Sequence, residues 1–167
     1  MGADNQQERL DANWVVGFVD GEGCFHIAIN QQDEMTLGWQ VLPEFRVVQH
    51  QRDEQVLHNL RNFFGCGNVV VNHGDRKEFR VRGLKNLSKI VEFFKTYKFQ
   101  TISKQKSFDV FSEILEMMSK KDHLKDGGMI KIANLTKTVN KKVVPRILKS
   151  SETIRQSNSL LQDIVRP

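Results

Sequence analysis

The chain has few cysteines and no long apolar run. Only 2 of its 167 residues are cysteine, Cys24 and Cys66, and their spacing is not that of a metal or redox pair. We interpret both as reduced thiols, which favours a protein inside a cell. No apolar run reaches membrane-spanning length, so we expect no membrane partner. Asp4, Glu8 and Asp11 make the start of the chain acidic, which argues against a transit peptide.

Basic residues are in modest excess, with 25 Lys and Arg against 20 Asp and Glu. The excess is uneven along the chain. Residues 1–84 hold 8 basic and 12 acidic side chains, whereas residues 85–167 hold 17 and 8. A basic second half suits contact with phosphates, although a ribosomal or membrane-surface partner would fit the same charge.

The hydrophobic patterning predicts one α+β domain across residues 1–167, with residues 1–10 and 158–167 frayed. A first helix, capped by Asp11 or Asn13, is expected to end near Gly21. The strands are expected over Cys24–Gln32, Gln40–His50, Asn68–Asn72 and Glu78–Arg82. Further helices are expected over 53–64, 84–94, 104–118 and 130–139, with a short one after Pro145 and loops at 33–38 and 120–128. Pro43 predicts a sheet edge or a bulge, because proline cannot donate to a strand ladder.

The segment from Trp14 to Gly23 combines glycines with an acid. Gly17 and Gly21 are four residues apart, so on a helix they form one smooth stripe. Each helical glycine costs about 1 kcal/mol relative to alanine, and close packing of a second backbone would justify that cost. Glu22 follows at the end of this helix, where carbonyls lack intrahelical partners. A divalent cation binding both Glu22 and the Gly21 carbonyl would stabilise this arrangement. A buried hairpin or a glycine-rich turn is the simpler alternative.

This segment resembles the signature of the LAGLIDADG homing endonucleases. The matching residues are Gly17, Phe18, Val19, Asp20, Gly21, Glu22 and Gly23. Val15 and Val16 depart from the usual leucine and small residue, and Glu22 stands where many members have aspartate. The resemblance implies an αββαββα core with additional C-terminal helices and an antiparallel DNA-binding sheet. It also implies that motif helices pack together, with Gly17, Gly21, Val16 and Asp20 in a dimer interface.

The chain shows this motif once. The resemblance therefore implies a homodimer in which each copy supplies one acid at the minor groove, beside a scissile phosphate. Such a dimer would read a long pseudo-palindromic site and cut both strands of double-stranded DNA. The implied cofactor is Mg²⁺, bound by Glu22 and the Gly21 carbonyl.

The resemblance assigns three further catalytic positions. Gln49 resembles the polar residue that orders the active-site water, and Lys104 resembles the basic residue near the scissile phosphate. The family's other basic residue falls at Arg52 or at Asp53 next to it. Glu22, Gln49, Lys104 and Arg52 are thus the expected catalytic residues.

Alternation along the strands predicts an outward face rich in Arg, Asn and Gln, the residues that pair with guanine and adenine edges. An ordinary solvated sheet face is the alternative interpretation. Arg46, Arg80 and Arg82 are the first choices for guanine contacts. The complete set of expected DNA-binding residues is His26, Asn30, Gln32, Gln40, Glu44, Arg46, Asn72, Glu78, Arg80, Arg82, Lys141 and Lys142.

Two other functions remain open on sequence grounds. One is a non-cutting protein of the same fold, either a maturase that binds intron RNA or a transcription regulator. The other is a ribosome-associated protein, which rests on charge alone. The resemblance also implies a gene in an organelle genome, chloroplast or mitochondrial, or in a bacterium.

Overall fold

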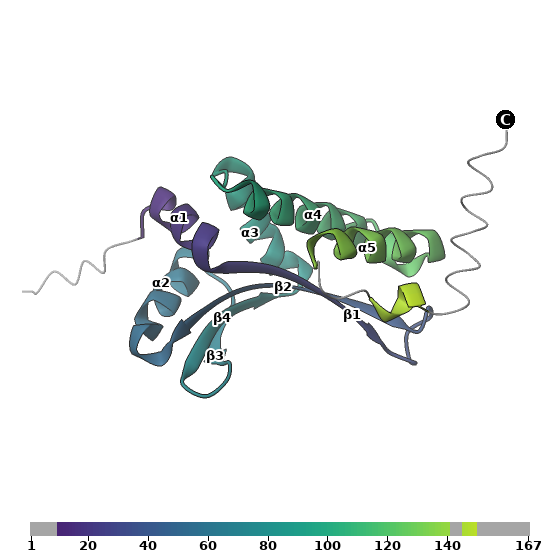
Figure 1. The fold of residues 1–167 in the computed structure, drawn as a ribbon, viewed down its shortest axis with the longest axis horizontal. Helices are drawn as coiled ribbons and strands as arrows, with labels where there is room; N and C mark the ends of the chain where they lie inside the picture. The colour runs from purple at the N-terminus through teal and green to yellow at the C-terminus, as the bar shows by residue number, and fades with distance from the viewer. Residues whose placement is uncertain (1–9, 141–144, 150–167) are drawn as a thin grey trace, which may run out of the picture. The chain divides into compact units, whose positions relative to one another are not determined.

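A computed structural model describes residues 10–140 and 145–149 (Figure 1). The expected αββαββα order is present, followed by further helices. The elements are α1 (Ala12–Glu22), β1 (Gly23–Gln31), β2 (Trp39–His50), η1 (Gln51–Asp53), α2 (Glu54–Phe64), β3 (Asn68–Val71), β4 (Arg76–Arg82), α3 (Leu84–Thr96), α4 (Ile102–Ser119), η2 (Asp122–Leu124), α5 (Asp126–Val139) and η3 (Arg146–Lys149).

The strands form one four-stranded sheet in the order β1-β2-β4-β3, and β4 pairs antiparallel with both β2 and β3. The α+β prediction is therefore confirmed. The pairing of β2 with β4 begins at Glu44, opposite Arg82. Pro43 lies one residue before this ladder, so its missing N–H disrupts no bond to β4.

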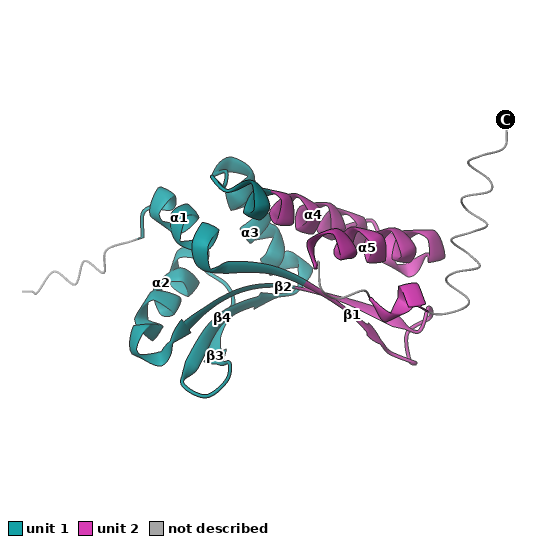
Figure 2. Ribbon diagram, viewed as in Figure 1, with its two compact units in different colours: residues 1–26, 44–105 teal, residues 27–43, 106–167 magenta. Residues whose placement is uncertain are grey.

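The chain divides into two compact units, shown in different colours in Figure 2. Unit 1 comprises residues 1–26 and 44–105, and unit 2 comprises residues 27–43 and 106–167. The single-domain expectation stays a prediction. All the expected catalytic residues lie in unit 1.

The core of unit 1 is a cluster of phenylalanine rings. Phe45 on β2, Phe79 on β4 and Phe94 on α3 are each 0% exposed. The ring of Phe45 lies 6.2 Å from that of Phe79 and 6.0 Å from that of Phe94. Strand alternation sends Phe45 and Phe79 to the face covered by helices, and Phe94 lies on the apolar face of α3, as the sequence predicts. Each such ring pair contributes about 0.5–1.5 kcal/mol beyond the burial of its area.

The end of α1 is set by close packing at Gly23. A Cβ there would lie 2.5 Å from Val19 Cγ1 and 2.8 Å from the Val19 carbonyl oxygen. Only glycine therefore lets the chain turn from α1 into β1 at this point. At the other end of α1, the Asp11 carboxylate accepts hydrogen bonds from the amides of Asn13 and Trp14, at 2.8 and 3.1 Å. Asp11 is thus the N-cap, and this fixes where the motif helix begins.

Unit 2 holds most of α4 and all of α5. The five apolar residues expected on one face of α4, Phe108, Phe111, Ile114, Leu115 and Met118, are all buried. The expectation of a loop through residues 120–128 is wrong for its last three residues, because α5 already begins at Asp126. A Cβ on Gly128 would lie 2.0 Å from the Asp122 carbonyl oxygen. Gly128 is therefore needed for the approach of α5 to η2, and its cost to the helix is offset by this packing.

Candidate active site

Glu22 is the last residue of α1, and its carboxylate is exposed. Gln49, near the end of β2, donates a hydrogen bond from Nε2 to Glu22 Oε2 at 3.1 Å. The two residues are 27 positions apart in the sequence. The fold thus joins the expected metal ligand to the residue expected to order water, at the point where α1 meets the sheet.

Lys104 is the third member of this group. Its ammonium donates a hydrogen bond to the carbonyl oxygen of Gly23, the residue after Glu22. Burial lowers the pKa of Lys104, while the nearby Cys24, Asp20 and Glu22 oppose the shift. One N–H of the ammonium is engaged with Gly23, which leaves two for another acceptor. A half-buried cation therefore lies beside the Glu22 carboxylate.

Asp20 connects α1 to the start of α4. Its carboxylate accepts hydrogen bonds from the amides of Gln100 and Thr101, at 2.9 and 3.0 Å, and from the Thr101 hydroxyl. Burial raises the pKa of Asp20, but these hydrogen bonds outweigh burial and leave the pKa below its usual value. Thr101 lies three residues before Lys104. Asp20 is expected in a dimer interface. In the structure its carboxylate forms hydrogen bonds within its own chain, where it holds the turn that leads to Lys104.

Arg52 lies in η1 with an exposed side chain. Its Nε is 3.3 Å from Asp53 Oδ2, and its amide donates to Nδ1 of His50 at 3.1 Å. His50 Nε2 is in turn 2.8 Å from Asp75 Oδ2, which ties this turn to the loop between β3 and β4. The structure thus pairs Arg52 with Asp53, the other position to which the resemblance pointed, and brings Glu22, Gln49 and Lys104 together without it.

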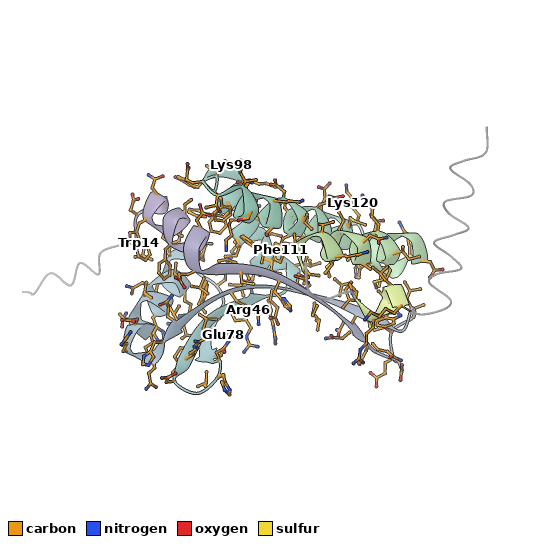
Figure 3. All side chains as sticks on the ribbon, viewed as in Figure 1. Trp14, Arg46, Glu78, Lys98, Phe111 and Lys120 are labelled. Carbon is orange, nitrogen blue, oxygen red and sulfur yellow. The ribbon has the colours of Figure 1, made fainter. Side chains whose placement is uncertain are left out.

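One face of α1 is open. Gly17 and Gly21 are exposed, and a Cβ at either position would meet no atom of residues 10–140 and 145–149 within 4 Å. Trp14 is 44% exposed and stacks on Phe18 with ring centroids 4.9 Å apart. Figure 3 shows Trp14 on the outer side of α1. Trp14, Gly17, Phe18 and Gly21 form what we call the α1 stripe.

Val16 does not belong to the α1 stripe. It is 7% exposed and forms part of the core, together with Val15 and Val19. Val15, Val16 and Val19 share the inward side of α1, so Val16 is buried within its own chain, and its expected place in a dimer interface stays a prediction. Trp14 and Phe18 are not among the residues expected in the interface. Their spacing of i, i+4 on the same face as Gly17 was the available signal.

The polar face of the sheet in unit 1 carries two carboxylates that are buried. Glu44 and Glu78 are 7% and 4% exposed, although alternation placed both on the outward face. They do lie on that face, but arginines from the same face cover them. Figure 3 shows Arg46 and Glu78 on the lower side of the strands. Both carboxylates are therefore buried by ion pairs on this face, Glu44 with Arg82 on the neighbouring strand and Glu78 with Arg80 on its own strand β4.

The ion pairs on this face divide into two groups. Arg82 donates from Nε to Glu44 Oε1 and also brings Nη2 to that oxygen, while Arg46 Nε lies 3.8 Å from Glu44 Oε2. Arg80 Nε lies 2.9 Å from Glu78 Oε1, and Asn72 Nδ2 donates to Glu78 Oε2 at 2.7 Å. Arg46 and Arg80 are cross-strand partners in the register. Both groups thus meet at the β2–β4 ladder.

His26 lies beside the first of these groups. Burial and the positive charge of Arg46 lower the pKa of His26, and Glu44 opposes the shift. A lowered pKa keeps the imidazole neutral near pH 7, so that one ring nitrogen donates and the other accepts.

The remaining expected DNA-binding residues lie elsewhere. Asn30, Gln32 and Gln40 belong to unit 2, where Asn30 and Gln32 are exposed and Gln40 is half-buried. Gln32 follows the end of β1, and its amide donates to the Gly38 carbonyl at 2.8 Å. Lys141 and Lys142 lie outside the described residues.

Known proteins resemble this chain in sequence and in fold. The profile of the family described as "LAGLIDADG endonuclease" matches residues 15–115. The chain is similar to the solved structure of a homing endonuclease, I-TnaI, with 44% identity, a TM-score of 0.76, and coverage of 92% of this chain and 97% of that one. It is also similar to I-SmaMI bound to an uncleaved DNA target in the presence of calcium ions. There the identity is 30%, the TM-score is 0.81, and the coverage is 84% of this chain and 48% of that one.

A curated relative from Neurospora crassa, "Probable intron-encoded endonuclease 2", is 33% identical over 126 residues. The alignment covers 74% of this chain and 26% of the relative. The chain spans about a quarter of the length of the first curated relatives that it matches.

Proposed function

Since the chain belongs to the LAGLIDADG endonuclease family, we propose that it is a site-specific DNA endonuclease that acts as a homodimer. The observation that carries the proposal is the convergence of Glu22, Gln49 and Lys104 at the end of α1. An exposed carboxylate, an amide bonded to it and a half-buried ammonium are the groups that phosphodiester hydrolysis needs. The substrate is double-stranded DNA with a long pseudo-palindromic site.

A divalent cation fits the residues at this site. The exposed Glu22 carboxylate and the Gly21 carbonyl, in the last turn of α1, are hard oxygen donors. Within residues 10–140 and 145–149, no group of three or more His, Cys, Asp and Glu side chains could hold a metal ion. One chain thus supplies few of the ligands, which suits Mg²⁺, because Mg²⁺ keeps several waters and binds one or two carboxylates plus substrate phosphates. When bound, the ion supplies a Lewis acid and a more acidic water.

Gln49 and Lys104 have separate roles. Gln49 uses Nε2 to hold Glu22 in place, and its carbonyl oxygen remains able to accept a hydrogen bond from the attacking water. The Lys104 ammonium is anchored on Gly23 and offers its other N–H groups to the scissile phosphate. A fixed cation there stabilises the negative charge that builds on the phosphate in the transition state.

The second carboxylate is proposed to come from a second copy of the chain. Among the described residues, a Cβ on Gly17 or Gly21 would meet no neighbour, so nothing in that part of the fold requires them to be glycine. Each costs a helix about 1 kcal/mol relative to alanine. A partner helix packed on the α1 stripe explains both glycines and also covers the exposed Trp14. A two-fold interface of this kind places one Glu22 beside each strand of a symmetric site.

The polar face of the sheet is proposed to read the DNA sequence. Arginine, asparagine and glutamine side chains on this face match the donor and acceptor pattern of base edges in the major groove. The name of the Neurospora crassa relative includes "intron-encoded". We propose the same kind of gene for this chain, in an organelle genome, with intron RNA as a further partner to be tested.

The test is selection of cleaved sites from a random library of duplex DNA. The protein is incubated with the library and Mg²⁺, and the cut ends are sequenced. Paired cuts at one pseudo-palindromic sequence would support cleavage and dimerisation together. EDTA should abolish the cuts and readdition of Mg²⁺ should restore them. Retained DNA without any cut, at every divalent cation tried, would indicate a non-cutting binder instead.

A further inference from the structure

Resting on the proposed function, a second inference concerns how the sheet presents its arginines. We propose that Arg80 is a guanine-reading residue and that Glu78 and Asn72 position it without touching DNA themselves. The juxtaposition that supports this is the chain of contacts from Asn72 on the β3 side, through the buried Glu78 carboxylate, to Arg80 on β4. All three residues are among the expected DNA contacts, and their contacts in the structure give them different roles.

Glu78 is not available to a base. It is 4% exposed, and both carboxylate oxygens are engaged within the chain. Oε2 accepts from Asn72 Nδ2 at 2.7 Å, and Oε1 lies 2.9 Å from Arg80 Nε. A buried carboxylate is tolerated only when it is paired and hydrogen-bonded, so breaking these contacts to reach a cytosine amino group would be costly.

The contact with Glu78 leaves the reading edge of Arg80 free. Glu78 engages Nε, whereas a bidentate contact to guanine O6 and N7 can use the two terminal nitrogens Nη1 and Nη2. The Arg80 side chain is 27% exposed, so it is partly ordered before DNA binds. Ordering in the free protein lowers the entropy that binding must otherwise remove.

Arg82 provides a contrast on the same strand. Glu44 contacts two of its nitrogens, Nε and Nη2, so the carboxylate occupies one edge of that guanidinium. The Arg82 side chain is 61% exposed. An arginine held by this edge is less suited to a bidentate base contact and better suited to a phosphate, which fixes position and not sequence. Arg80 and Arg82 are two residues apart, but their glutamates contact different guanidinium nitrogens. Arg80 therefore suits a contact with a base, and Arg82 suits a contact with a phosphate.

The experiment measures base preference by binding. Duplexes selected from a random library by the unaltered protein, in Ca²⁺ and at one salt concentration, are varied one base pair at a time. Arg80→Ala should reduce the preference at one guanine per half-site by on the order of 10- to 100-fold. Asn72→Ala and Glu78→Gln should reduce preference at that same position by about 2- to 10-fold, the cost of ordering one side chain.

Controls separate positioning from general damage. In the Arg80→Ala background, Glu78→Gln should have no further effect on preference, because its effect passes through Arg80. Glu44→Gln, on the other glutamate of this face, should leave the Arg80 position unchanged. Asn72 is exposed, so Asn72→Ala remains testable if the Glu78 variant does not fold.

Three outcomes would overturn the inference. Glu78→Gln could change preference at a different base pair, or keep its full effect without Arg80, and either result would show direct contact by Glu78. Arg80→Ala could weaken all sequences alike, which would make Arg80 a phosphate contact. These results leave DNA binding intact and are therefore distinct from failure of the proposed function, in which the unaltered protein selects no duplex at all.

Discussion

The carboxylates at the end of α1 and those on the polar face of the sheet have opposite surroundings. Glu22 is exposed and accepts one hydrogen bond, from Gln49. Glu44 and Glu78 are buried, and each is paired with arginine from the same unit. Both regions belong to unit 1, so the difference is local and does not reflect separate domains.

This difference shows which carboxylates already form an ion pair with arginine in the chain. On the sheet, each carboxylate is paired with arginine within the chain, so under the proposal above these glutamates order the arginines for contact with DNA. At the end of α1, the Glu22 carboxylate has a neutral partner and a cation close by, and its remaining lone pairs face outward. A buried pair stabilises a geometry, whereas an exposed carboxylate is available for an incoming metal ion.

The largest expected effect separates these two kinds of carboxylate. Glu22→Gln should lower the rate of DNA cleavage by at least about 10³-fold, because several kcal/mol of charge stabilisation depend on the metal ion that it holds. Binding to the same DNA should change little. Cleavage and binding are measured separately on one selected duplex. Loss of both together would show that Glu22 has a structural role.

Removal of the Lys104 charge is expected to have the second-largest effect on the rate of cleavage. Lys104→Met keeps the length of the side chain and removes the charge, and should reduce cleavage by on the order of 10²-fold with binding nearly unchanged. Lys106→Met, at an exposed position two residues further along α4, is the matched control and should cut at the unaltered rate. Equal losses in the two variants would mean that Lys104 contributes only to the net charge.

Gly17→Ala tests the α1 stripe with effects of opposite sign. Its Cβ meets nothing in the monomer, so thermal unfolding should show a gain of up to about 1 kcal/mol. The dimer should weaken by about 10-fold, because the added Cβ keeps the partner helix away. Sedimentation over a range of protein concentrations measures this change.

Gly127→Ala is the control for the measurements of stability and of dimerisation on Gly17→Ala. Gly127 is also helical, in α5, and equally open. The substitution should raise stability without changing the dimer. If Gly17→Ala behaves in the same way, the α1 stripe is not the interface.

The smallest expected effect is a pH-dependent change in folding stability caused by His26 on β1. The pKa of His26 is lowered in the folded protein, chiefly by burial and then by Arg46. The unfolded chain therefore binds the proton more readily, and His26 destabilises the fold as pH falls through its unfolded pKa of about 6.5 toward the lower folded value. The loss should be a fraction of a kcal/mol, because water screens a half-exposed side chain.

Denaturant unfolding between pH 7.5 and 5 measures this loss. His26→Gln should remove that part of the pH dependence, whereas His58→Gln, in α2, should leave it in place. An unchanged profile in His26→Gln would mean that His26 titrates alike in the folded and unfolded chains.

Much of the fold follows from local pattern. The order of helices and strands through α3, the apolar face of α4 and the cap at Asp11 were all predictable, because each depends on residues within a few positions of one another. The early start of α5 was not predictable, since Gly128 is accounted for by its approach to the Asp122 carbonyl and not by helix propensity. The inward position of Val16 was not predictable either, because the motif by itself does not say which side of α1 faces the core.

The sequence by itself determined most of the element types, the motif with its acid, and a sheet face rich in arginine and amides, because the spacing of side chains along one helix or strand decides these features. Tertiary structure alone decided that Asp20 binds Thr101, 81 residues away, and that Lys104 reaches Gly23. Contacts between distant segments depend on how elements pack and on which rotamers that packing allows, and no local pattern of residues encodes either.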